Sequence, residues 1–84
     1  MSTFEYAPKG VCSRLMNFEI NDNKIHNLRV MGGCNGNLQG IGKLVEGMDI
    51  DEVIRRVEGI RCGGKATSCP DQLAQALKVA KEQL

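Results

Sequence analysis

The sequence predicts one small α+β domain, in which an antiparallel sheet is covered on one face by about three helices. Segments in which apolar and polar residues alternate come first along the chain, and segments with a helical spacing of apolar residues come later. This separation of strands from helices is typical of the α+β class. The 84 residues suffice for a single domain over positions 1–84, but not for a catalytic barrel or a doubly wound nucleotide-binding domain.

The predicted sheet is a hairpin with an additional edge strand before it. Alternating apolar residues indicate the edge strand at Thr3–Ala7 and the hairpin strands at Cys12–Ile20 and Lys24–Met31. The polar cluster Asn21–Asn23 is typical of the turn between the hairpin strands. Ile25 breaks the alternation, so the pattern leaves its side of the sheet open. The positions expected to face the core are Met16, Phe18, Ile20, Leu28 and Val30.

Three helices are predicted after the turn Gly32-Gly33-Cys34. We expect another backbone to pack against Gly40 and Gly42, because glycine otherwise destabilises a helix. Asp49 begins the second helix with the spacing of a capping box, and Cys69 and Pro70 read as N-cap and first position of the last. The apolar stripes are Leu38, Ile41 and Val45; Ile50, Val53, Ile54 and Val57; and Leu73, Ala76, Leu77, Ala80 and Leu84. Gly47 and Gly59 end the first two helices.

Composition favours a protein that works without nucleic acid or a membrane. The formal net charge is +1, from 11 basic and 10 acidic side chains, and neither sign forms a block. No apolar run is long enough to cross a bilayer, and the N-terminus does not read as a signal peptide. We therefore expect a cytoplasmic protein, in which cysteines stay reduced and serve as metal ligands or redox groups more often than as structural disulfides.

The four cysteines are the candidate functional residues. Cys12, Cys34, Cys62 and Cys69 have the spacing C-x21-C-x27-C-x6-C, and each lies at the end of a predicted element. The hairpin brings the first two to one end of the sheet. Four thiolates suit zinc or an iron-sulfur cluster. The alternative is that the cysteines are small buried apolar residues or scattered thiols.

A redox role is open for the last two cysteines. Cys62 and Cys69 flank a loop with two glycines, and the start of a helix at Cys69 favours a thiolate by lowering the pKa of the cysteine. On this alternative the pair is a reversible dithiol.

Other polar residues are weaker candidates. The single histidine, His26, is expected on the surface rather than as a ligand. Arg14, Arg61 and Lys65 lie near cysteines in the sequence, where they either stabilise thiolates or act as solvated loop charges. Asp71 is expected to cap its helix. No Ser/His/Asp set or paired-carboxylate site is visible, which argues against a hydrolase.

The segment Ala66-Thr67-Ser68-Cys69-Pro70-Asp71 resembles the motif that names the TSCPD domain family. The resemblance covers nearly the whole chain and includes the C-terminal domain of adenosylcobalamin-dependent ribonucleotide reductases. It implies that all four cysteines are metal ligands. The further segments that carry it are Gly10-Val11-Cys12, Gly32-Gly33-Cys34 and Gly59-Ile60-Arg61-Cys62.

The same resemblance connects the chain with ribonucleoside-diphosphate reductase, and so with deoxynucleotide supply for DNA synthesis and with nucleotide binding. The chain has no room for the catalytic barrel of those enzymes and no phosphate loop of the G-x-x-x-x-G-K-[ST] type. An autonomous catalytic site is therefore not visible, and we name no catalytic residue.

A weaker resemblance links the chain to U-type iron-sulfur cluster assembly scaffolds. These have cysteines at positions like Cys12, Cys34 and Cys69 in a similar order of elements. This chain departs from them at Arg14, where the scaffolds have an acidic residue, and at Cys62, which has no counterpart there.

The sequence-based hypothesis is a non-enzymatic metal-binding module that holds zinc and acts as an accessory or docking unit, with a ribonucleotide reductase as the expected partner. The alternatives are the thiol redox module that uses Cys62 and Cys69, and a scaffold or carrier for an iron-sulfur cluster.

Overall fold

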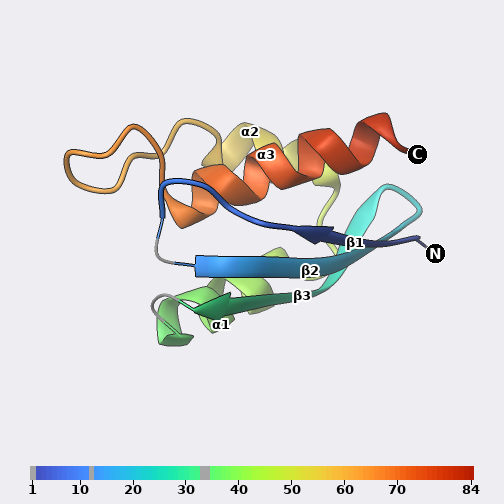
Figure 1. Ribbon diagram of the computed structural model, residues 1–84. Helices are drawn as coiled ribbons and strands as arrows, with labels where there is room; N and C mark the ends of the chain where they lie inside the picture. Colours follow the sequence, from blue (N-terminus) through green and yellow to red (C-terminus); the bar gives the residue numbers. More distant parts are fainter. Residues whose placement is uncertain (1, 12, 33–34) are drawn as a thin grey trace.

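Three antiparallel strands are followed by three helices in the part of the chain that the structure, a computed structural model, describes: residues 2–11, 13–32 and 35–84 (Figure 1). The predicted α+β class is confirmed. The strands are β1 (Ser2–Tyr6), β2 (Ser13–Asn21) and β3 (Lys24–Gly32), and the helices are α1 (Asn35–Val45), α2 (Ile50–Val57) and α3 (Cys69–Glu82). None of these helices is long and apolar enough to cross a membrane.

The strands lie in the order β1-β2-β3, so the predicted edge strand pairs with the first strand of the hairpin. Phe4 on β1 faces Phe18 on β2 with ring centroids 5.7 Å apart. The hairpin turn places Asp22 and Asn23 at positive φ of 55° and 63°. Two such residues fit the right-handed twist of the strands, and aspartate and asparagine tolerate this conformation well.

A β-bulge explains why Ile25 breaks the alternation. The pairing of β2 with β3 shifts between Asn17 and Glu19, where β3 contains one residue more. Asn27 takes up the bulge with a φ of 55°, and its side-chain amide donates to Glu19 Oε2 at 3.1 Å. The extra residue shifts the alternation of side chains by one position. Ile25 is therefore fully buried on the same side of the sheet as the partly buried Leu28.

The core lies between one face of the sheet and the helices. Met16, Phe18 and Ile20 of β2 are buried, whereas the residues between them are only partly covered. All three helices contribute to this cluster, which confirms the prediction that they cover one face of the sheet. The helical members of the cluster are Val45, Ile50, Val53, Leu73, Ala76, Leu77 and Ala80. Leu84, predicted in the same stripe, is instead 61% exposed because it lies beyond the end of α3.

The two glycines inside α1 have different surroundings. A Cβ atom at Gly42 would lie 3.2 Å from the carbonyl oxygen of Leu28, so the predicted close packing is confirmed there. At Gly40 a Cβ atom would meet no described atom within 4 Å. No backbone of the described residues packs against Gly40, so the prediction is wrong there. Gly40 lines a cavity instead of facing a strand.

Of the capping box predicted at the start of α2, only the N-cap residue Asp49 acts as expected. The Asp49 carboxylate accepts a hydrogen bond from the backbone N–H of Asp51 at 2.9 Å, as an N-cap residue does. Glu52 does not act as the second member of the box. It pairs instead with Arg55 and with Arg56, three and four residues further along the same helix.

Replacing Gly40 by Ala should raise the free energy of unfolding by about 1 kcal/mol, because alanine favours a helix by that amount and the described surroundings leave room for the methyl group. Gly42→Ala is the matched control, and contact with the Leu28 carbonyl should offset its gain. Urea unfolding measures both. Equal stabilisation by the two variants would contradict this account of α1.

Candidate functional site

The N-cap of α3 is Ser68, and Cys69 occupies the first helical position. Ser68 Oγ accepts from the backbone N–H of Asp71 at 3.1 Å and donates to the carbonyl oxygen of Ile60 at 2.6 Å. The predicted cap at Cys69 is therefore wrong by one residue, because a serine hydroxyl satisfies the exposed amides better than a thiol. Ser68 is only 3% exposed. Its two hydrogen bonds therefore fix the direction in which α3 begins.

The carboxylate of Asp71 joins the two ends of the loop that precedes α3. It accepts from the backbone N–H of Gly59 at 2.7 Å and from the hydroxyl of Thr67 at 2.5 Å. These bonds, that from Thr67 first, hold the pKa of the carboxyl below its usual range although burial acts in the opposite direction. Asp71 was predicted to cap its helix. It instead closes loop 59–68, because Ser68 already caps the helix.

Backbone hydrogen bonds then position Cys62 within this loop. Its N–H donates to the carbonyl oxygen of Thr67 at 3.1 Å, and its carbonyl oxygen accepts from Lys65 at 3.0 Å. Gly63 has a φ of 57°, which the tight turn between Cys62 and Lys65 requires. The loop thus presents Cys62 as an exposed residue, while Cys69 is half-buried.

Gln72 is a site residue that the sequence analysis did not single out. Its Oε1 accepts from the backbone N–H of Lys9 at 2.9 Å and from the hydroxyl of Tyr6 at 3.4 Å. Its Nε2 donates to Thr67 Oγ1 at 3.0 Å. The side chain is 7% exposed. The signal in the sequence was a glutamine one turn before Ala76, on the face of α3 that is otherwise apolar.

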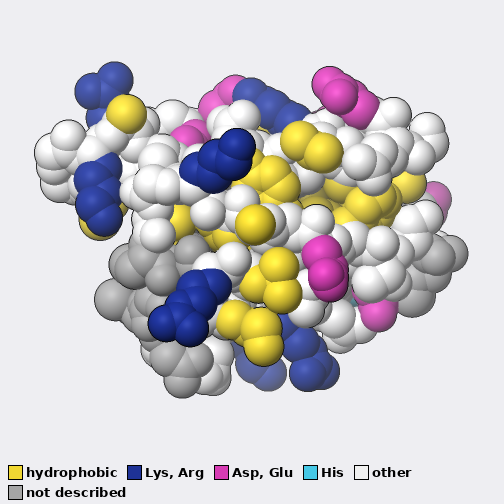
Figure 2. All heavy atoms as spheres, viewed as in Figure 1, with side chains coloured by type: hydrophobic (Ala, Val, Ile, Leu, Met, Phe, Trp, Pro, Cys, Tyr) yellow, Lys and Arg dark blue, Asp and Glu magenta, His cyan; other side chains and the backbone are white. Residues whose placement is uncertain are grey.

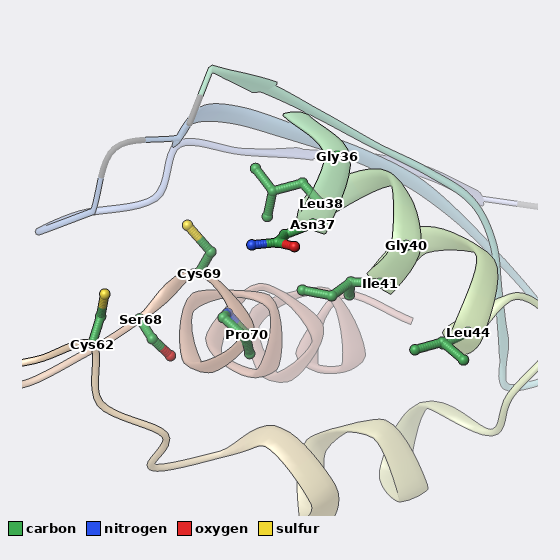
Figure 3. A pocket seen from close by; sticks show the side chains of 10 residues that line it. All are labelled: Gly36, Asn37, Leu38, Gly40, Ile41, Leu44, Cys62, Ser68, Cys69 and Pro70. Carbon is green, nitrogen blue, oxygen red and sulfur yellow. The ribbon is translucent and has the colours of Figure 1, made fainter. Parts of the chain in front are cut away.

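Cys62 and Cys69 line the same cavity, which has a volume of about 540 Å³. Figure 3 shows both side chains pointing to the same side at one end of this cavity, with α1 opposite. The prediction that these two cysteines lie together is supported by this shared lining. The remaining lining residues are Ser68 and Pro70 from the start of α3, and Gly36, Asn37, Leu38, Gly40, Ile41 and Leu44 from α1.

Cys12 and Cys34 lie outside the described residues, so the predicted set of four ligands stays a prediction. Among residues 2–11, 13–32 and 35–84, no group of three or more His, Cys, Asp or Glu side chains is placed to hold a metal ion. The described residues that flank Cys12 and Cys34 in the chain show which end of the molecule these segments reach. Ser13 pairs with Gly32 where the hairpin ends, and Figure 1 shows this end of β2, the beginning of α1 and loop 59–68 at the same end of the molecule.

Basic side chains lie on the loop that carries Cys62, whereas the histidine lies beside the bulge of β3. Arg61 and Lys65 are exposed on loop 59–68, and Figure 2 shows Lys and Arg side chains at this end of the molecule, at the left of the view. Arg14 is exposed at the beginning of β2. His26 lies beside the bulge of β3, where its Nδ1 is 2.7 Å from Glu46 Oε2.

Asp71→Asn should lower the free energy of unfolding by about 1.5 to 3 kcal/mol, because the amide keeps one acceptor oxygen and loses the other from a charged, buried hydrogen-bond set. Urea unfolding of metal-free protein measures this. Glu58→Gln is the matched control, since the Glu58 side chain forms a surface ion pair with Lys78, which is worth less than about 1 kcal/mol. Equal effects of the two substitutions would contradict the role assigned to Asp71.

Comparison with known proteins identifies the family of the chain. The family model of the TSCPD domain matches residues 2–81, which is nearly the whole sequence. Neither curated proteins nor solved structures give a match. The family match confirms the first resemblance noted in the sequence, and it gives no support to the weaker resemblance to iron-sulfur scaffolds. The chain belongs to the TSCPD domain family.

Proposed function

We propose that this domain is a non-enzymatic zinc-binding module that acts as an accessory or docking unit of a ribonucleotide reductase. Membership of the TSCPD family implies a module associated with that enzyme. The observation that carries the metal-binding part is the convergence of the chain segments next to all four cysteines at one end of the domain. The family match lends no support to nucleotide binding, and we do not propose it.

The segment before Cys12 lies against the loop that holds Cys62. Lys9 is hydrogen-bonded to Gln72, and a Cβ atom at Gly10 would lie 3.3 Å from Thr67 Cγ2. Gly10 is two residues from Cys12 along the chain, and neighbouring Cα atoms are about 3.8 Å apart. This contact supports a site that Cys12 shares with Cys62 and Cys69.

The segments around Cys34 approach the same place. Gly32 pairs with Ser13 at the end of the hairpin. Ser13 is the residue that follows Cys12 in the chain. Beyond Cys34, residues Gly36 to Leu38 line the cavity together with Cys62 and Cys69. Both flanks of Cys34 therefore support its inclusion in the site.

The donor set fits zinc. Four thiolates give the closed tetrahedral coordination of a structural zinc site, and the described lining of the cavity contains no carboxylate to compete with them. The exposed Arg61 and Lys65 favour the excess negative charge of four thiolates around one divalent ion. Bound zinc would supply folding free energy to a small core, and Cys12, Cys34, Cys62 and Cys69 would hold it. We place the module in the cytoplasm, where such thiols stay reduced.

A thiol redox role is the second candidate, because Cys62 and Cys69 line one cavity and Cys69 lies at the first position of a helix. In this reaction the two thiols form a disulfide and release two electrons and two protons, which reduce a disulfide of a partner protein to two thiols. An iron-sulfur cluster held by the same four thiolates is a third candidate.

Metal analysis of the protein purified without oxygen, together with its visible absorption spectrum, separates the three candidates. We expect one zinc per chain and a colourless protein. A brown protein with iron and sulfide would replace the zinc proposal by the cluster. A metal-free protein that shows Cys62 and Cys69 oxidised as a pair would replace it by the redox role.

Cys34→Ser should remove the stabilisation that zinc gives, because it deletes a ligand outside the Cys62–Cys69 loop. Zinc at 100 times its dissociation constant should stabilise the wild type by about 2.7 kcal/mol, and the variant much less. Thermal unfolding with zinc and with chelator measures the difference. The metal-free proteins are the control and should unfold alike. Full stabilisation of the variant by zinc would overturn the four-cysteine site.

A further inference from the structure

We propose that Gln72 is the positioning residue of the zinc site, because its side-chain amide ties the segment before Cys12 to the loop that carries Cys62. This inference rests on the proposed function and adds to it a residue that is not a ligand. A zinc site assembled from distant segments needs such a tie, since ligands that are already in place bind the ion more tightly than ligands that must be ordered.

Both ends of the Gln72 amide are used, and each end reaches a different segment. Oε1 accepts from Lys9 N at 2.9 Å and from Tyr6 Oη at 3.4 Å, across 63 and 66 positions of sequence. Nε2 donates to Thr67 Oγ1 at 3.0 Å, five positions away. A buried amide is stable only when it is hydrogen-bonded, so the 7% exposed Gln72 holds these partners in place.

Thr67 carries the effect of Gln72 to Cys62. The Thr67 hydroxyl accepts from Gln72 and donates to Asp71, so its side chain is fixed from two sides. The carbonyl oxygen of the same residue accepts from the backbone N–H of Cys62 at 3.1 Å. Gln72 therefore acts on Cys62 through one residue, and on the Cys12 side through Lys9.

Replacing Gln72 by Leu keeps most of the volume and removes all three hydrogen bonds. Zinc affinity, measured by competition with a chromophoric chelator, should fall about 10- to 100-fold, as is usual when the support of a ligand is lost. Thr67→Val removes only the hydroxyl and should also weaken zinc binding. Thr67→Ser keeps the hydroxyl and should bind zinc like the wild type. Because both changes break the same bond, the double variant Gln72→Leu/Thr67→Val should lose less than the product of the single losses.

Ile50→Val is the control for a general loss of stability. Ile50 is fully buried at the other end of the sheet, where its N–H donates to Asn23 in the hairpin turn. This variant should unfold more easily and keep its zinc affinity. If folded Gln72→Leu and Thr67→Val bind zinc as tightly as the wild type, Gln72 has no positioning role. If the wild type binds no zinc, the proposed function fails, and this inference fails with it.

Discussion

The first turn of α3 is the constraint on which the rest of the site depends. Ser68, Asp71 and Gln72 are polar and buried there. The side chain of each forms hydrogen bonds with a different segment of the chain. Ser68 holds Ile60, Asp71 closes the loop between Gly59 and Thr67, and Gln72 reaches the segment after β1. Because a buried polar group without a partner is strongly destabilising, these segments must stay together for the domain to fold.

The hairpin of the sheet positions the segments that lead to Cys12 and Cys34. Its hairpin is fixed at one end by a two-residue turn with positive φ angles and along its length by the buried side chains of β2. The bulge at Asn27 turns Ile25 into the core, and a second register shift, between Ser13 and Leu15, precedes the pairing of Ser13 with Gly32 at the other end of the hairpin. The end of the hairpin that leads to Cys12 and Cys34 is therefore set by the strand pairing as well as by the packing of β2 against the helices.

Local patterns in the sequence predicted most of the elements, because alternation and helical spacing report which residues are buried. The burial of Ile25 could not be predicted, since it depends on a bulge that only the pairing of β2 with β3 defines. The surroundings of Gly40 and Gly42 differ for the same reason: a strand lies against one and a cavity against the other. Propensity alone shows that a glycine is unusual in a helix, but not what lies beside it.

The candidate site was predictable in its residue types and less so in its details. Cys62 and Cys69 could be expected together because only six residues separate them, two of which are glycines. The cap at Ser68 was missed because Cys69 stood next to a proline that marks a helix start. Gln72 was missed because its partners, Lys9 and Thr67, come together only in the folded chain.

The central claim is that the TSCPD domain gathers four thiolates around one metal ion. X-ray absorption at the zinc edge of the zinc-loaded protein tests it most directly, because zinc–sulfur and zinc–nitrogen or zinc–oxygen bonds differ in length. The account predicts four sulfur ligands at about 2.3 Å. A shell with two sulfur atoms, completed by oxygen or nitrogen at about 2.0 to 2.1 Å, would contradict it.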